Sequence, residues 1–171
     1  CGQMDRQLHF LHCGVRLQKS LKTEIDEVLS VVDSIRWKRE FSITLSKGTL
    51  KHQTAYNKQF AMEFETRGWE LQPRLSESPR LIGDFRKQLV FGEIQFGNSS
   101  TLYRDFYKFQ YGHQKGLLSL AVLITPVKPT EFFPTRPRSV ANMAEYDLAL
   151  RYFTILPISV PTLIVGLLAS K

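Results

Sequence analysis

The chain has 171 residues, a length that predicts one domain (residues 1–171) with a hydrophobic core. Its composition, 43% hydrophobic and 23% charged, is that of a soluble globular protein, and its two cysteines exclude a disulfide scaffold and a Cys-type zinc site. The net charge of +7 favours a polyanionic partner, nucleic acid before an anionic membrane surface, although a basic protein without such a partner is the alternative.

The first predicted helix spans residues 20–32, with Ser20 as its N-cap. Apolar residues recur along it at the spacing of one helical face. Glu24 and Glu27 lie near the polar face, where we interpret them as solvated charges, with a position over a metal ion as the alternative. The apolar residues are Leu21, Ile25, Val28, Leu29 and Val32.

A basic segment follows over residues 35–52, and the Ser-Lys-Gly sequence around Lys47 is a turn signal. We interpret this segment as a loop or short hairpin over phosphates, or as an exposed loop with no partner. Residues 54–67 predict a helix that ends at Gly68, followed by Trp69 as a core anchor and a linker over residues 73–79. The predicted buried side of that helix consists of Tyr56, Phe60, Met62 and Phe64.

The stretch around Asp84 and Glu93 carries the strongest functional signal. Asp84 precedes a strand-like segment, residues 88–96, in which alternation places Glu93 and Gln95 on one face. A hairpin between Asp84 and Glu93 would bring the first acid back beside the other two side chains. Two carboxylates and an amide at one point suit Mg²⁺, and in a basic chain such a site indicates phosphodiester chemistry. Solvated acids at a strand edge are the alternative.

The remaining elements complete an α/β pattern. A helix over residues 101–113, with Arg104 and Lys108 on its outer side, is stopped by Gly116 and followed by a strand buried on both faces, residues 117–125. A helix over residues 142–152 and a strand over residues 162–168 come last. Prolines interrupt the C-terminal apolar run, which argues against a membrane anchor. This order predicts a mixed central sheet flanked by helices.

The pattern Asp84, Glu93, Gln95 and Phe96, followed by a Gly-Asn-Ser-Ser loop and a helix, resembles the type II restriction endonucleases of the BglII and BstYI group. This group belongs to the PD-(D/E)xK nuclease superfamily, and glutamine in place of the superfamily lysine is its mark. Stretches 24–28, 67–69 and 160–167 are similar in type and order. The resemblance implies a restriction-endonuclease-like core, with residues 80–125 as its catalytic part and residues 128–140 as a base-reading loop.

The resemblance also implies roles for individual residues. Asp84 and the backbone carbonyl of Ile94 would bind Mg²⁺, Glu93 would bind the ion or orient the attacking water, and Gln95 would contact water or the scissile phosphate. Asn98 would reach a base edge. The other residues expected at the DNA are Lys47, Ser99, Ser100, Arg104, Thr135, Arg136, Arg138 and Ser139. Two features depart from the relatives: Gly83 replaces the superfamily proline, and Arg136 and Arg138 replace small polar residues.

The function implied is Mg²⁺-dependent, site-specific cleavage of palindromic double-stranded DNA, with a GATC-containing target. We expect a homodimer in the cytoplasm of a prokaryote, without a membrane partner, paired with a cognate DNA methyltransferase. One alternative is a non-catalytic DNA-binding module on the same fold, which would bind without cleaving. Another is a superfamily nuclease for repair intermediates or RNA, which preference for single strands or RNA over duplex DNA would reveal.

Overall fold

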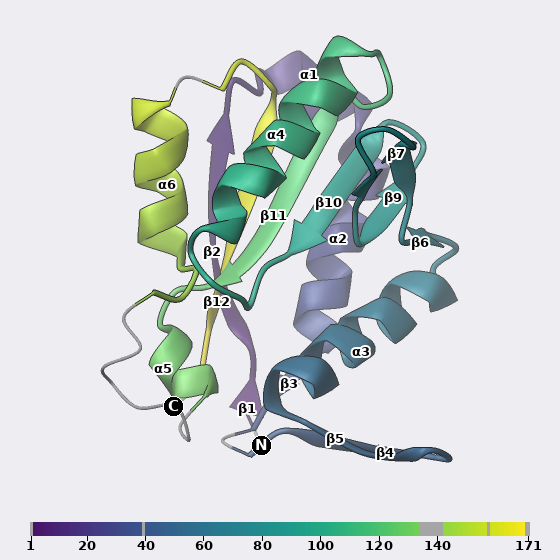
Figure 1. Cartoon of the computed structure of the whole chain (residues 1–171), viewed down its shortest axis with the longest axis vertical. Coiled ribbons are helices and arrows are strands. Elements are labelled where there is room, and N and C mark those ends of the chain that lie inside the picture. The colour runs from purple at the N-terminus through teal and green to yellow at the C-terminus, as the bar shows by residue number, and fades with distance from the viewer. Residues whose placement is uncertain (1, 39, 134–141, 157, 170–171) are drawn as a thin grey trace.

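The computed structural model describes residues 2–38, 40–133, 142–156 and 158–169 of the chain, and it is built around a six-stranded mixed sheet (Figure 1). The strand order is β2-β12-β11-β10-β9-β6. The central strands β10 (Val90–Ile94), β11 (Leu120–Pro126) and β12 (Thr162–Leu168) run parallel. The outer strands β2 (Asp5–Leu11), β9 (Phe85–Lys87) and β6 (Glu70–Leu71) are antiparallel to their neighbours. The predicted mixed sheet is confirmed.

Helices cover both faces of this sheet. The helices α2 (Lys22–Ser34) and α3 (His52–Thr66) pack into one hydrophobic cluster, while α4 (Thr101–Gln114) and α6 (Tyr146–Ile155) pack into a second. Figure 1 shows α4 and α6 in front of the sheet and α2 behind it. The smaller elements are α1 (Val15–Ser20), α5 (Pro129–Phe132), β1 (Gly2–Gln3), β3 (Arg36–Trp37), β4 (Ser42–Leu45), β5 (Gly48–Lys51), β7 (Arg74–Ser76) and β8 (Leu81–Ile82).

The two central strands β11 and β12 read as continuous apolar runs because both of their faces are covered. All seven residues of β11 are buried, as are six of the seven in β12. Parallel strands between helical layers show this pattern. The bounds predicted for the last strand, residues 162–168, are confirmed, whereas β11 begins three residues later than predicted. None of the helices in the described ranges is both long enough and apolar enough to cross a membrane.

Several predictions for the N-terminal half were wrong in detail. The strand β2, which pairs with β12 along its whole length, was not predicted. Helical structure already begins at Val15, and Ser20 is no N-cap, because its hydroxyl donates to the carbonyl of Leu17 at 3.0 Å at the end of α1. Met62 is 38% exposed, since it lies two residues after the buried Phe60 and so on the opposite side of α3.

Two later segments also differ from the prediction. The stretch expected to be a linker, residues 73–79, contains β7, which pairs with β8 in a short antiparallel hairpin. The last helix begins at Tyr146, four residues after the predicted start. The basic segment does form the predicted hairpin, in which β4 pairs with β5, and Figure 1 shows it projecting from the body of the molecule.

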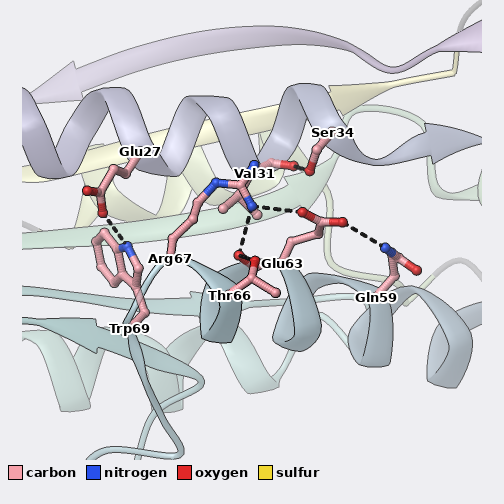
Figure 2. Close-up of polar contacts among 8 residues, drawn as sticks. All are labelled: Glu27, Val31, Ser34, Gln59, Glu63, Thr66, Arg67 and Trp69. Atoms are coloured by element: carbon pink, nitrogen blue, oxygen red, sulfur yellow. Dashed lines mark hydrogen bonds and ion pairs between the residues drawn. The ribbon is translucent and has the colours of Figure 1, made fainter.

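A polar cluster ties α2 to the segment that follows α3. Figure 2 shows the carboxylate of Glu27 facing the indole of Trp69, and the Trp69 Nε1 donates to it at 2.7 Å. The Lys87 ammonium of β9 donates to both oxygens of the same carboxylate, at 2.8 and 3.1 Å. Next to this contact, Arg67 of the same segment donates to Glu63 at 2.7 Å. Glu27, expected to be a solvated charge, is therefore an acceptor shared by two other elements.

Candidate active site

The β9–β10 hairpin brings Asp84 back beside Glu93, as the sequence predicted. In this hairpin Phe85 pairs with Gly92, and Val90 pairs with Lys87. The Asp84 backbone N–H donates to the carbonyl of Gly92 at 3.0 Å. The Asp84 carboxylate accepts a hydrogen bond from the backbone N–H of Ile94 at 2.7 Å. Asp84 is thus fixed to the residues on both sides of Glu93.

Two glycines allow this close approach. A Cβ at Gly92 would lie 2.1 Å from the ring of Phe85, and a Cβ at Gly83 would lie 2.2 Å from the ring of Phe91. The Gly83 N–H also donates to the carbonyl of Pro73 at 2.9 Å, a bond that a proline at this position cannot make. The absence of proline at this position therefore has a local cause: the Pro73 carbonyl requires a backbone N–H, which proline lacks, and the Phe91 ring leaves no room for a Cβ.

Glu93 of β10 and Gln95, directly after this strand, lie on the side of the sheet that is covered by α4. The Lys108 ammonium donates to Glu93 Oε1 at 2.7 Å, and Gln95 Nε2 donates to Asp105 Oδ2 at 2.8 Å. The Gln95 Oε1 accepts from the backbone N–H of Gly97 at 3.0 Å. The strand residues predicted to share one face do share it, and one helix contacts both of them.

Burial dominates the electrostatics of this cluster. Glu93 is 5% exposed, and burial raises the pKa of its carboxyl well above the ordinary value, an effect that the nearby charges of Asp84 and Asp105 increase and Lys108 opposes. Burial likewise raises the pKa of Asp105 to about 6, against the opposing effects of the Gln95 hydrogen bond and of Lys108. In both carboxyls burial is the largest cause of the raised pKa, and it outweighs the stabilisation of the charged form by Lys108.

This donor set fits a hard divalent cation. The Lys108 ammonium lies 2.7 Å from Glu93 and 3.9 Å from Asp105, and Asp84 adds a third negative charge close enough to raise the pKa of both carboxyls. Carboxylate and carbonyl oxygens are the ligands that such ions prefer. Among the described residues, no group of three His, Cys, Asp or Glu side chains is arranged to hold a metal. Glu93 and Asp105 are instead bonded to Lys108 and Gln95, so a site here would rest on Asp84, Glu93 and the Ile94 carbonyl.

A groove of about 530 Å³ opens beside Asp84 and Ile94. The helix α3 lines it with Lys58 and two other polar side chains, and Leu50 of β5 also lines it. The groove therefore joins the candidate ion ligands to the basic hairpin. Its full lining is Leu50, Thr54, Asn57, Lys58, Ala61, Phe64, Leu71, Gln72, Asp84 and Ile94.

The residues predicted to bind DNA are spread over several surfaces. Lys47 lies exposed in the turn between β4 and β5, and Arg104 lies exposed on α4. Asn98 is exposed after β10, and its side-chain oxygen accepts from the Ser100 N–H at 2.9 Å. Ser99 is half-buried and donates its N–H to the carbonyl of Asn142 at 2.8 Å. The predicted base-reading residues Thr135, Arg136, Arg138 and Ser139 lie outside the described residues.

Sequence reasoning missed Asp105 and misplaced Lys108. Lys108 was expected on the outer side of its helix, but it is buried against the sheet. The available signal was their position: Leu102, Asp105 and Phe109 recur at helical spacing, so Asp105 interrupts an apolar face and Lys108 borders it. A charged residue within such a face needs a partner inside the protein.

Comparisons with known proteins identify the family and the fold. A family model described as restriction endonuclease BglII/BglIII matches residues 7–167, whereas no curated protein matches the chain. The fold is similar to that in the crystal structure of restriction endonuclease BglII complexed with a DNA 16-mer. The two are 15% identical with a TM-score of 0.68, over 97% of this chain and 79% of that chain. The chain therefore belongs to the restriction endonuclease BglII/BglIII family, which makes it a type II site-specific endonuclease, a hydrolase.

Proposed function

We propose that the chain uses Mg²⁺ to hydrolyse phosphodiester bonds within a palindromic site of double-stranded DNA, with GATC-containing sequences as the first to test. The observation that carries the proposal is the hairpin that fixes Asp84 beside Glu93, next to a groove that continues toward a basic hairpin. The net charge of +7 suits a polyanionic substrate. The solved relative, a complex with a DNA 16-mer, supports the same class of substrate.

The chemistry of each site residue suggests a separate role for it. Asp84, Glu93 and the Ile94 carbonyl would hold the ion, which when bound supplies charge relief at the phosphate and lowers the pKa of water. Glu93 also orients the attacking water. Gln95 carries no charge, so it would position the water or the scissile phosphate without neutralising the charge on the phosphate. Its amide is held at both ends, by Asp105 and by the Gly97 N–H, which fixes its plane before DNA arrives.

Three parts of the chain would contact the DNA. The β4–β5 hairpin presents Lys47, which we assign to phosphates because an exposed lysine binds them without reading sequence. The loop after β10 and the start of α4 present Asn98, Ser99, Ser100 and Arg104, with Asn98 reaching a base edge. The segment with Thr135, Arg136, Arg138 and Ser139 would read the remaining bases, and its arginines suit guanine O6 and N7.

A palindromic target calls for a two-fold protein, and we propose that α4 forms the dimer interface. The helix α2 buries its apolar residues in its own core. The helix α4 instead leaves Tyr103 49% and Tyr107 54% exposed, and the end of α6 adds Leu156 at 53%. These residues line one apolar groove of about 440 Å³. Charge substitution at Tyr107 would therefore yield monomers in sedimentation experiments.

The decisive experiment is digestion of a sequenced plasmid or phage genome with and without Mg²⁺. We expect discrete bands that require Mg²⁺ with the wild-type chain, and none with Asp84→Asn, which should still bind DNA. Asp26→Asn, which changes an exposed carboxylate on α2, is the matched control and should cut normally. Cutting by Asp84→Asn at a near wild-type rate would show that Asp84 binds no catalytic ion.

Other outcomes of that digestion separate the remaining candidates. A smear would identify a nonspecific nuclease, and a shifted DNA band without cutting would favour the binding module. If bands appear, sequencing their ends gives the site, and DNA methylated within that site should resist cleavage, as pairing with a cognate methyltransferase requires. Gln95→Lys and Gln95→Ala then test the glutamine: an unchanged rate for Gln95→Ala would remove Gln95 from the site.

A further inference from the structure

The buried charges of the described residues belong to one cluster. Within the described ranges, the charged side chains classed as buried are Glu93, Asp105 and Lys108, at 5%, 2% and 7% exposure. Withdrawing an ammonium from water is costly, and a buried ion pair seldom stabilises a protein more than apolar residues of the same volume would. Stability alone therefore gives a weak reason for a lysine at this position of α4, and its neighbours point to another reason.

Lys108 and Asp105, which lie within one turn of α4, contact the two proposed site residues Glu93 and Gln95. The Lys108 Nζ lies 2.7 Å from Glu93 Oε1 and 3.9 Å from Asp105 Oδ1, and Asp105 Oδ2 accepts from Gln95 at 2.8 Å. Asp105 and Lys108, three residues apart on α4, thus share the helix face that meets Glu93 and Gln95, two residues apart in extended chain. The chain of contacts runs from Glu93 through Lys108 and Asp105 to Gln95, so neither strand side chain can turn without disturbing the other.

Glu93 needs a positive partner that β10 does not supply. Gln95, its neighbour on the same face, is neutral, and Asp84 and Asp105 both repel a charge on Glu93. Lys108 reaches the carboxylate from the opposite layer. With Oε1 engaged by Lys108, Oε2 is the oxygen that remains for an ion or a water.

We propose that Lys108 is a positioning residue of the cleavage reaction, whose ammonium holds the Glu93 carboxylate in its working orientation. The proposal rests on the proposed function of Glu93. It differs from the view that the ammonium merely occupies the place of the cation and leaves when the cation binds. The two views predict opposite effects of removing the charge: loss of a positioning group lowers the rate at saturating metal, while loss of a competitor leaves that rate intact and tightens metal binding.

The test uses Lys108→Met and Lys108→Arg, with Lys115→Met, at an exposed lysine just after α4, as the matched control. Four quantities are measured: the melting temperature, duplex DNA affinity without divalent ions, Mn²⁺ affinity of the DNA complex by calorimetry, and the single-turnover cleavage rate at saturating Mg²⁺. Should Lys108→Met fail to fold, Lys108→Gln removes the charge while keeping a polar group.

We expect Lys108→Met to keep its DNA affinity, to bind Mn²⁺ at least about 10-fold more weakly and to cleave about 100-fold more slowly, the range typical of groups that orient a metal ligand. Lys108→Arg should cleave at least about tenfold faster than Lys108→Met, because it restores the positive charge. A wild-type rate for Lys108→Met at saturating Mg²⁺, or tighter Mn²⁺ binding, would overturn the proposal. The Mn²⁺ readout needs no cleavage, so a wild-type chain that fails to cut would refute the proposed function separately.

Discussion

Replacing Gly92 by alanine tests whether the hairpin at the active site depends on the missing side chain. The new Cβ would lie 2.1 Å from the Phe85 ring, far inside contact distance. The ring cannot move away freely, because it stacks on Phe64 with centroids 3.9 Å apart and meets Trp69 edge-on. Overpacking of this kind costs about 1–3 kcal/mol. For a chain of this size each kcal/mol lowers the melting temperature by roughly 2–4 °C.

The strand β9 must shift to relieve the contact, and Asp84 immediately precedes it. We therefore expect Gly92→Ala to lower the cleavage rate even at a temperature where the protein remains folded. Urea unfolding followed by circular dichroism gives the free energy of unfolding, and a supercoiled-plasmid assay gives the rate. The double variant with Phe85→Leu removes the ring, so the cost of Gly92→Ala should fall by at least half in that background. An equal cost in both backgrounds would refute the steric argument.

Three further predictions concern single residues. Burial raises the pKa of Tyr56 to about 12. The stabilisation by its neutral phenol is therefore complete below pH 10 and is lost as the pH rises through 12. Absorbance titration at 295 nm should show one tyrosine that ionises at a higher pH than the others, and Tyr56→Phe should remove that step. Glu27→Ala should cost about 1–3 kcal/mol in urea unfolding by orphaning the Trp69 N–H, and clearly less in a Trp69→Phe background. Lys47→Ala should reduce the slope of log DNA affinity against log salt concentration by about one. Lys19→Ala, on α1 at the opposite end of the molecule in Figure 1, is the control and should leave that slope unchanged.

Patterns of apolar residues revealed most of the fold. The strand at residues 162–168 was predicted correctly because a short, continuous apolar run directly after Pro161 is typical of a buried strand. The strand β2 was missed because it lies at the sheet edge and its residues alternate irregularly, with exposed Leu8 and His9 side by side. Tertiary pairing with β12, rather than local pattern, makes this segment a strand. That residues 1–171 form one domain stays a prediction.

The candidate site was partly predictable for a related reason. Asp84, Glu93 and Gln95 belong to one hairpin, and local spacing is enough to bring them together. Asp105 and Lys108 reach the same point from a different layer, so their role depends on how α4 crosses the sheet, which no sequence spacing specifies. The roles given to Asp84, Glu93 and Gln95 remain predictions until the variants are measured.

Two sides of the helix α4 face different surroundings. One side holds Glu93 and Gln95 through Lys108 and Asp105, and the other exposes Tyr107 next to Tyr103, whose ring stacks on Tyr152 of α6 at 4.9 Å between centroids. Because both sides belong to one helix, a shift of α4 at the tyrosines would also move Lys108, which binds Glu93, and Asp105, which binds Gln95. A second copy seated on those tyrosines would hold the helix in place, and specific activity would then rise with protein concentration as free subunits pair.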